Sequence, residues 1–201
     1  MKKINKIVFA THNHGKVEEI RGILKDLGIR VVSADEAGVP EDVVEDGKTF
    51  EENALKKTEF VGKASGQWAM GDDSGICVEA LDGAPGIYSA RWAGENAPGE
   101  EWVKLLMSKM EGVPEGKRGA WFETAAVLRS RSGEHWTFVG RVDGRIATEA
   151  RGVAHTRLPY DVVFIPEGDS RTFSEMSGEE KNAISHRGRA FRKLKAFIQG
   201  L

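Results

Sequence analysis

Apolar runs and amphipathic stretches alternate along the first part of the chain. Residues 4–10 end in a continuous apolar run, Ile7 to Ala10, which is typical of a strand covered on both faces. Apolar residues then recur at helical spacing as far as Leu27, and Gly28 ends this predicted helix. A second short strand is predicted at residues 29–34. The order strand, helix, strand indicates a parallel α/β unit.

The rest of the chain contains further helices and strands in a less regular order. Apolar residues at helical spacing predict helices at residues 49–63, 100–110 and 186–198, and a further helical region is expected to begin at residues 178–182. Strand-like runs lie at residues 68–70, 120–129, 135–145 and 160–165, and the second and third of these are expected to pair. The acidic segment 35–47 is predicted to be a loop. Early alternation followed by a late hairpin predicts an α/β fold, with a mixed sheet flanked by helices.

Composition narrows the class of function. The chain has 201 residues, 29 of them basic and 31 acidic, with a net charge of −2. This length predicts one domain, or two closely joined lobes, over residues 1–201. The near-neutral charge gives no bulk attraction to nucleic acid or membranes. No apolar stretch reaches the ~18 residues that span a bilayer.

The only cysteine, Cys77, excludes an intramolecular disulfide and fits a reducing compartment. It lies in an apolar run, so we expect a buried side chain and not a nucleophile. The first residues become polar too soon for a secretory signal. A soluble, cytoplasmic protein with no nucleic-acid or membrane partner is therefore expected.

A polar loop that contains glycine follows the first predicted strand and opens the first predicted helix. It carries Thr11, Asn13, Gly15 and Lys16. Such a loop directs backbone N–H groups and the positive end of the helix dipole at an anion. The dipole disfavours a cation in the first turn, so a bound phosphate would explain Lys16. The spacing is not that of a Walker A loop, and an ordinary strand-to-helix turn is the alternative.

Two adjacent carboxylates, Asp72 and Asp73, follow the apolar run at residues 68–70 and precede Ser74 and Gly75. Carboxylates at the end of a strand suit Mg²⁺, which takes one or two of them together with water and phosphate oxygens. The same residues are also common in a turn without a ligand. We therefore expect Asp72 and Asp73 to lie in a turn. Whether this turn binds Mg²⁺ or has no ligand remains open at this point.

A third polar cluster precedes the last predicted helix and contains Lys181, Ser185, His186 and Arg187. These side chains could bind an anion or the edge of a purine. A solvated helix start capped by Ser185 is the alternative.

Taken together, the three clusters resemble the inosine triphosphate pyrophosphatase family. The resemblance rests on segments that occur in the family's order from Lys6 to Leu194, nearly the whole chain. They read ATHNHGKVEEI, TFEENALKK, GDDSGICVEALDGAPGIYSARWAG, YDVVFIPEG, TFSEM and EEKNAISHRGRA. The middle and final segments are long and specific.

The resemblance implies an α/β fold of two lobes, with the active site in the cleft between them, usually in a homodimer. It implies Mg²⁺-dependent hydrolysis of non-standard purine nucleoside triphosphates (ITP, dITP, XTP) to the monophosphate and pyrophosphate, which cleanses the nucleotide pool. Asp73 corresponds to the general base and, with Glu45, to the metal ligands. The substrate-binding positions correspond to Thr11, Asn13, Gly15, Lys16, Lys57, Ser74, Tyr160, Asp161, Lys181, His186 and Arg187.

Elementary chemistry agrees with these implied roles. Mg²⁺, Lys16 and Lys57 would neutralise a triphosphate and stabilise charge in the transition state. Hypoxanthine and xanthine carry a 6-oxo group where adenine carries an amine. Donors from His186 and Arg187 would therefore favour ITP and XTP over ATP, because the wrong base leaves buried donors unpaired.

One segment departs from the family pattern. Members usually carry a glycine-rich approach that ends in Phe-Gly-Tyr-Asp-Pro, whereas this chain has Leu158, Pro159, Tyr160, Asp161 and Val162. Leu158 stands where an aromatic side chain is expected to stack on the base. Proline fixes φ and removes an N–H, so the backbone path changes if a positive φ is needed there. This departure predicts an altered base preference or affinity.

Two other functions remain as alternatives. A nucleotide-binding protein with little turnover would need a damaged metal site, but Asp73, Glu45 and Lys16 are all present. A pyrophosphatase for modified pyrimidine triphosphates is disfavoured by His186 and Arg187. A panel of nucleotides would separate these functions.

Overall fold

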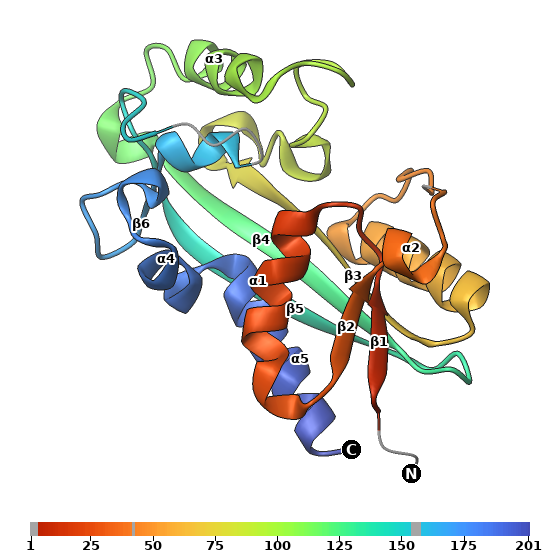
Figure 1. The fold of residues 1–201 in the computed structure, drawn as a ribbon. Coiled ribbons are helices and arrows are strands. Elements are labelled where there is room, and N and C mark those ends of the chain that lie inside the picture. The colour runs from red at the N-terminus through yellow and green to blue at the C-terminus, as the bar shows by residue number, and fades with distance from the viewer. Residues whose placement is uncertain (1–3, 42, 154–157) are drawn as a thin grey trace. The chain divides into compact units, whose positions relative to one another are not determined.

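The computed structural model describes residues 4–41, 43–153 and 158–201. Within these residues, six strands form one sheet in the order β2-β1-β3-β4-β5-β6 (Figure 1). The strands are β1 (Lys6–Phe9), β2 (Arg30–Ser33), β3 (Trp68–Val78), β4 (Gly119–Arg129), β5 (His135–Ile146) and β6 (Phe164–Pro166). β1 is parallel to β2 and β3, and β6 is antiparallel to β5. The predicted α/β fold with a mixed sheet is confirmed.

The helices follow the predicted order. They are α1 (His14–Leu24), α2 (Phe50–Ser65), α3 (Gly99–Lys109), α4 (Gly178–Ile184) and α5 (His186–Gln199). Side chains that accept from free N–H groups fix two of the starts: Thr49 caps α2, and Ser177 caps α4. Single turns of 3₁₀ helix are η1 (Lys25–Leu27), η2 (Asp35–Ala37), η3 (Glu79–Leu81), η4 (Gly86–Tyr88), η5 (Glu115–Lys117), η6 (Pro159–Val162) and η7 (Phe173–Glu175).

The chain divides into two compact units. The first comprises Met1–Asp73, Thr124–Gly140 and Arg187–Leu201, and the second comprises Ser74–Glu123 and Arg141–His186. Each of β3, β4 and β5 therefore contributes residues to both units. No helix in the described ranges is long and apolar enough to cross a membrane.

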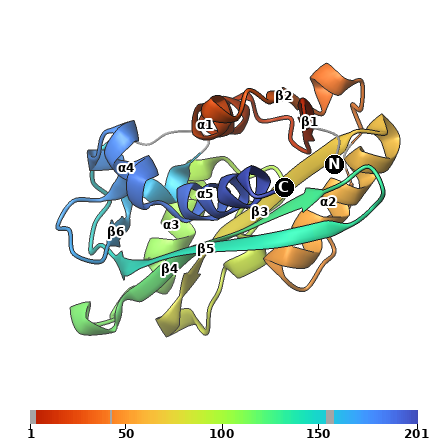
Figure 2. The same cartoon turned by 90° about the horizontal axis from the view of Figure 1, so that it is seen from below.

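Side chains of the first unit form two apolar clusters, one for each face of β1. Ile7 and Phe9 pack with α1 and α5, which lie side by side in both views (Figures 1 and 2). Val8 and Ala10 pack in a second cluster with Val61 of α2. Successive side chains of a strand point to opposite faces, so the continuous apolar run at residues 7–10 is buried on both.

In the second unit, a cluster of aromatic side chains forms the core. Phe122 of β4 contacts the rings of Phe164 and Phe173, with centroids 4.8 Å and 6.0 Å away. Leu106 and Met110 of the α3 region close the same cluster. Edge-to-face and offset contacts of this kind stabilise beyond the apolar area they bury.

Two predicted elements are corrected. Asp72 and Asp73 do not lie in a turn, because β3 runs through them without interruption from Trp68 to Val78. The segment 160–165 is not one strand: residues 159–162 form the turn η6, and β6 begins at Phe164. The departure from the family pattern falls partly on residues 154–157, which lie outside the described residues.

A buried arginine joins several segments of the second unit. Arg118 is 5% exposed and donates to the carbonyl oxygens of Met110, Val113, Ile146 and Ala147 at 2.9–3.2 Å. Replacing Arg118 with leucine is expected to lower the free energy of unfolding by about 3 kcal/mol, because several buried acceptors lose their donor. Urea denaturation would measure this. Arg118→Lys should lose less, and a leucine variant as stable as the wild type would contradict the expectation.

Candidate active site

The loop after β1 is held by its own side chains. Asn13 is the N-cap of α1, and its side-chain oxygen accepts from the N–H groups of Gly15 (3.0 Å) and Lys16 (3.3 Å). The hydroxyl of Thr11 accepts from the N–H of Asn13 at 3.1 Å. Thr11, Asn13 and Gly15 thus shape the loop that was predicted to bind phosphate. The loop follows Phe9, the last residue of β1, which pairs with Met70 of β3. The next residues of β3 include Asp72 and Asp73.

Lys16 lies beside a buried carboxylate. Its ammonium nitrogen is 3.2 Å from both carboxylate oxygens of Asp72, which is 1% exposed. Arg187, at the start of α5, places its Nε 3.3 Å from Asp72 and its guanidinium 3.1 Å from Glu19 of α1. An ion-pair network therefore links α1, β3 and α5. Asp72 stabilises the cation in the first turn of α1, a position that had suggested a phosphate.

Charge within this network shifts the ionisation of its members. Burial raises the pKa of Asp72, but Lys16 and Arg187 outweigh burial and hold it well below its usual range. Burial lowers the pKa of Lys16, against the opposing effect of Asp72. Burial also acts to lower the pKa of Arg187, but Asp72 and Glu19 raise it overall. The network thus holds one fixed anion between two cations.

Asp73 lies in a different environment, because neighbouring residues of a strand face opposite sides of the sheet. One of its oxygens accepts from the side-chain amide of Asn53 in α2 at 3.0 Å. The other is 3.5 Å from the ammonium group of Lys57, also in α2. Lys57 is 3.0 Å from Glu45 as well, so the carboxylates of Glu45 and Asp73 face one ammonium group.

The surroundings of Asp73 shift its ionisation toward the neutral form. Burial raises the pKa of Asp73, with Lys57 opposing the shift and Glu45 adding to it. Burial alone would lower the pKa of Lys57, but Asp73 and Glu45 raise it overall. A carboxylate with a raised pKa is a stronger base than an ordinary aspartate, and a proton-transfer role uses that property.

The donor set at this point fits Mg²⁺. Glu45 and Asp73 supply hard oxygen ligands, and Mg²⁺ is often held by one or two carboxylates with water and phosphate completing the shell. No group of three or more His, Cys, Asp and Glu side chains could hold a metal in the described part of the chain. Two carboxylates would leave coordination positions for water and substrate oxygens.

Five of the predicted substrate-binding residues belong to the second unit, and three of them, Tyr160, Asp161 and Lys181, are held by polar or ionic partners there. The hydroxyl of Tyr160 donates to the carbonyl of Ser89 at 3.0 Å, and burial raises its pKa. Asp161 forms an ion pair with Lys181. Ser74 is half-buried on β3, directly after Asp73. Tyr160 is therefore tied into the core of the unit by its polar end.

His186 is held by an aromatic stack. Its ring lies 4.7 Å from that of Phe122, with an interplanar angle of 11°. The ammonium group of Lys181 lies 5.4 Å from the centre of the Phe173 ring. The aromatic cluster of the second unit thus positions two of the predicted substrate-binding side chains.

Sequence reasoning missed two members of the site, Glu19 and Asn53, which hold predicted residues without being among them. It considered Asp72 as a metal ligand beside Asp73, but not as the partner of Lys16. Strand alternation at β3 could have separated Asp72 from Asp73. Glu19 lies one turn after Lys16, on the same side of α1, which was an available signal. The partner of Asn53 lies 20 residues away and had no local signal.

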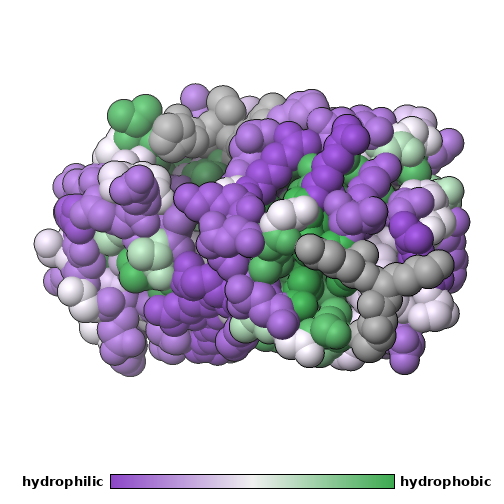
Figure 3. Space-filling view, turned by 60° about the horizontal axis from the view of Figure 1, so that its bottom comes forward, coloured by the Kyte–Doolittle hydropathy of each residue, from purple (hydrophilic) through white to green (hydrophobic). Residues whose placement is uncertain are grey.

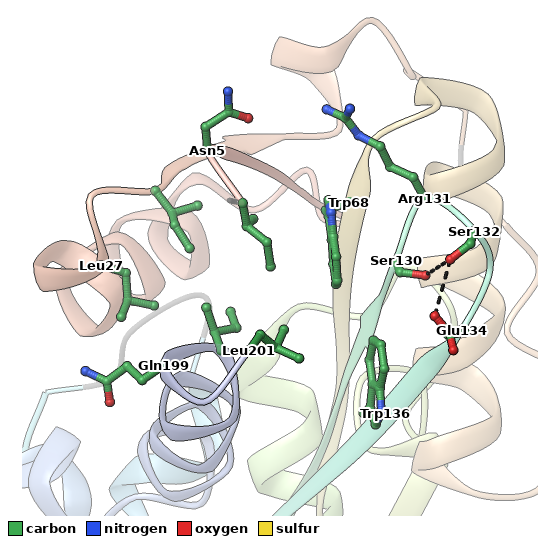
Figure 4. Close-up of a pocket in the computed structure, with 13 residues that line it drawn as sticks. Asn5, Leu27, Trp68, Ser130, Arg131, Ser132, Glu134, Trp136, Gln199 and Leu201 are labelled. Carbon is green, nitrogen blue, oxygen red and sulfur yellow. Dashed lines mark hydrogen bonds between the residues drawn. The ribbon is translucent and has the colours of Figure 1, made fainter. Parts of the chain in front are cut away.

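A cavity of about 940 Å³ lies elsewhere in the first unit, near the C-terminal end (Figure 4). Trp68 and Trp136, whose rings stack at 6.2 Å, form one of its walls, and Leu27 and Leu201 contribute to the other side. A hydrophobic patch is also visible on the face shown in Figure 3. Among the described residues, the lining of this cavity includes no member of the clusters around Asp72 and Asp73.

Comparison with known proteins gives a consistent result. The profile of the Ham1 family matches residues 7–197. A dITP/XTP pyrophosphatase of Streptomyces avermitilis is 42% identical over 200 residues, covering 98% of this chain and 99% of that protein. The Ham1 protein of Staphylococcus aureus superposes with a TM-score of 0.88 at 37% identity, covering 98% and 99% of the two chains. A HAM1 protein from Coxiella burnetii gives 0.90 at 35% identity, covering 98% and 100%.

Proposed function

Since this chain belongs to the Ham1 family, we propose that it hydrolyses the non-standard purine nucleoside triphosphates ITP, dITP and XTP to the monophosphate and pyrophosphate. The membership confirms the resemblance that the sequence motifs indicated. The relative from Streptomyces avermitilis, similar over its full length, is a dITP/XTP pyrophosphatase. The observation that carries the proposal for this chain is the pair of charged clusters on β3, one around each aspartate.

The two clusters divide the chemistry. Water attacks at the α–β linkage, the bond to pyrophosphate breaks, and Asp73 accepts the proton that the water loses. Lys16 and Lys57 bind phosphate oxygens and offset the negative charge of the transition state. Asp72 keeps Lys16 in place at the phosphate loop. Asn53 keeps Asp73 oriented.

We assign Mg²⁺ to Glu45 and Asp73. When bound, the ion supplies positive charge to the phosphates and makes water more acidic. Lys57, which contacts both carboxylates, would share with the ion the neutralisation of the phosphates. The hard oxygen donors of these two carboxylates support the proposed metal dependence, and chelation tests it.

Base recognition falls to the basic residues of the C-terminal motif. His186 and Arg187 donate to the 6-oxo group of hypoxanthine or xanthine, which adenine lacks. Tyr160, Asp161 and Lys181 complete the base side, as the family resemblance implies. We also propose a homodimer in the cytoplasm. Light scattering of the purified protein should give the mass of two chains.

The central prediction concerns substrate choice. Pyrophosphate release from ITP, XTP and dITP with Mg²⁺ should exceed release from ATP by about 100-fold or more in kcat/KM, because adenine has no 6-oxo group and leaves the donors unpaired. GTP and dUTP complete the panel of nucleotides. Excess EDTA should abolish turnover, and added Mg²⁺ should restore it. No turnover with any nucleotide would favour a binding protein, and a preference for dUTP would favour a pyrimidine pyrophosphatase.

A second candidate function is the same hydrolysis to monophosphate and pyrophosphate with a preference for a different base. Leu158 is 36% exposed, and Pro159 is the first residue of η6. A leucine at this point offers apolar contact but no ring to stack on a base. On this alternative, kcat/KM for ITP and XTP is reduced relative to another nucleotide in the same panel. Undiminished kcat/KM for ITP and XTP would exclude it.

A further inference from the structure

Asn53 is a buried amide that uses both of its ends. It lies in the first turns of α2 and is 0% exposed. Its side-chain oxygen accepts from the N–H of Gly47 at 2.8 Å, and its side-chain nitrogen donates to Oδ2 of Asp73 at 3.0 Å. One amide therefore connects β3 to the segment that carries Glu45, two residues before Gly47.

The contact with Gly47 depends on the absence of a side chain there. A Cβ at this position would lie 2.5 Å from Oδ1 of Asn53 and 2.8 Å from Cβ of Glu52. Any larger residue would have to move the amide or the backbone of the segment. Gly47 and Asn53 thus form a close-packed joint beside Glu45.

From this geometry we propose that Asn53 is a positioning residue, which holds Glu45 and Asp73 in the arrangement that binds the divalent cation. The inference rests on the proposed function of these two carboxylates. By fixing Oδ2 of Asp73, the amide turns Oδ1 toward Lys57. By accepting from the N–H of Gly47, the same amide fixes the backbone that positions Glu45. Neither contact adds charge to the site.

Asparagine suits this task for a chemical reason. A donor is required toward the carboxylate and an acceptor toward the backbone N–H, and an amide supplies both on one rigid plane. Aspartate at position 53 would lose the donor and place a carboxylate against Asp73. Leucine would keep the branched shape at Cγ and lose both contacts. Groups that orient metal ligands typically change metal affinity or activity by about 10–100-fold when they are removed.

The test compares Asn53→Leu with a matched control on the same helix. Thr58→Val also removes a buried polar group of α2: the Thr58 hydroxyl is bonded to the carbonyl of Ala54 at 2.7 Å and is 0% exposed. Thermal unfolding establishes that both variants are folded. Binding of Mn²⁺ to the full chain without nucleotide is then measured from the EPR signal of the free ion.

Asn53→Leu is expected to weaken Mn²⁺ binding by about 10-fold or more and to raise the Mg²⁺ concentration required for half-maximal turnover. Thr58→Val should bind Mn²⁺ as the wild type does. Gly47→Ala keeps the asparagine at position 53 but displaces its side-chain amide, so it should also weaken Mn²⁺ binding. This variant replaces Asn53→Leu in the test if Asn53→Leu does not fold. Wild-type affinity for Mn²⁺ in a folded Asn53→Leu or Gly47→Ala protein would overturn the proposal.

Failure of the proposed role of Asn53 can be distinguished from failure of the proposed function. If the wild type released no pyrophosphate from any nucleotide, the proposed reaction would be wrong whatever the Mn²⁺ titrations gave. Normal turnover by the wild type with unchanged Mn²⁺ binding in the variants would remove only the role of Asn53.

Discussion

Asp73→Asn should reduce kcat for ITP and XTP by about 10²–10⁴-fold, the range that a general base contributes. The substitution keeps the size of the side chain and an oxygen that can accept from the amide of Asn53. It removes the charge that faces Lys57 and the basic group that takes the proton. Burial raises the pKa of Asp73, so a neutral side chain is tolerated at this position and the fold should persist.

The measurement is steady-state release of pyrophosphate, with circular dichroism to establish folding. Asp143→Asn provides the control, because it removes an exposed carboxylate that forms an ion pair with Arg141. Its kcat should match the wild type. A value of kcat within about threefold of the wild type for Asp73→Asn would exclude a role in proton transfer.

The elements of this fold are predictable where local patterns decide them. The apolar run at residues 7–10 predicted a strand buried on both faces, and the clusters around Ile7 and Val8 confirm it. The helix expected at residues 49–63 is α2, which begins after the cap residue Thr49. Periodicity identifies such elements because burial of one face or both is a property of the local sequence.

The centre of the site shows where local patterns fail. Glycines at positions 71 and 75 flank the two aspartates, and a polar segment between glycines is typical of a turn. The structure extends β3 through this segment because distant cations compensate the buried charge. The partners of Asp72 lie 56 and 115 residues away in the sequence. No short-range pattern contains that information.

Because β3 is continuous, the adjacent residues Asp72 and Asp73 have different partners. Two aspartates in a turn could bind a single ion together, as the sequence suggested. In a strand they face opposite sides, so Asp72 meets Lys16 and Arg187 while Asp73 meets Lys57 and Asn53. The residue types were recognisable from the sequence, but their pairing was not.

Asp72→Asn is therefore expected to act on stability as well as on turnover. Removing one partner from a buried ion pair typically costs about 3–5 kcal/mol, because the remaining charge stays buried without compensation. Here the neutral amide would leave Lys16 facing Arg187, whose side chain is 7% exposed. We expect the free energy of unfolding to fall by this amount and kcat/KM to fall with it, since Lys16 would leave the phosphate loop.

A double-mutant cycle separates this repulsion from a simple loss of packing. Lys16→Met removes one of the two cations, so the double variant Lys16→Met/Asp72→Asn should be more stable than the sum of the single effects predicts. The difference is measured by urea denaturation of the four proteins, and neighbouring charges couple by about 0.5–3 kcal/mol. Turnover should not recover in the double variant, because the phosphate-binding lysine is absent. Additive effects on stability would show that Asp72 does not hold the two cations together, and the network linking α1, β3 and α5 would lose its basis.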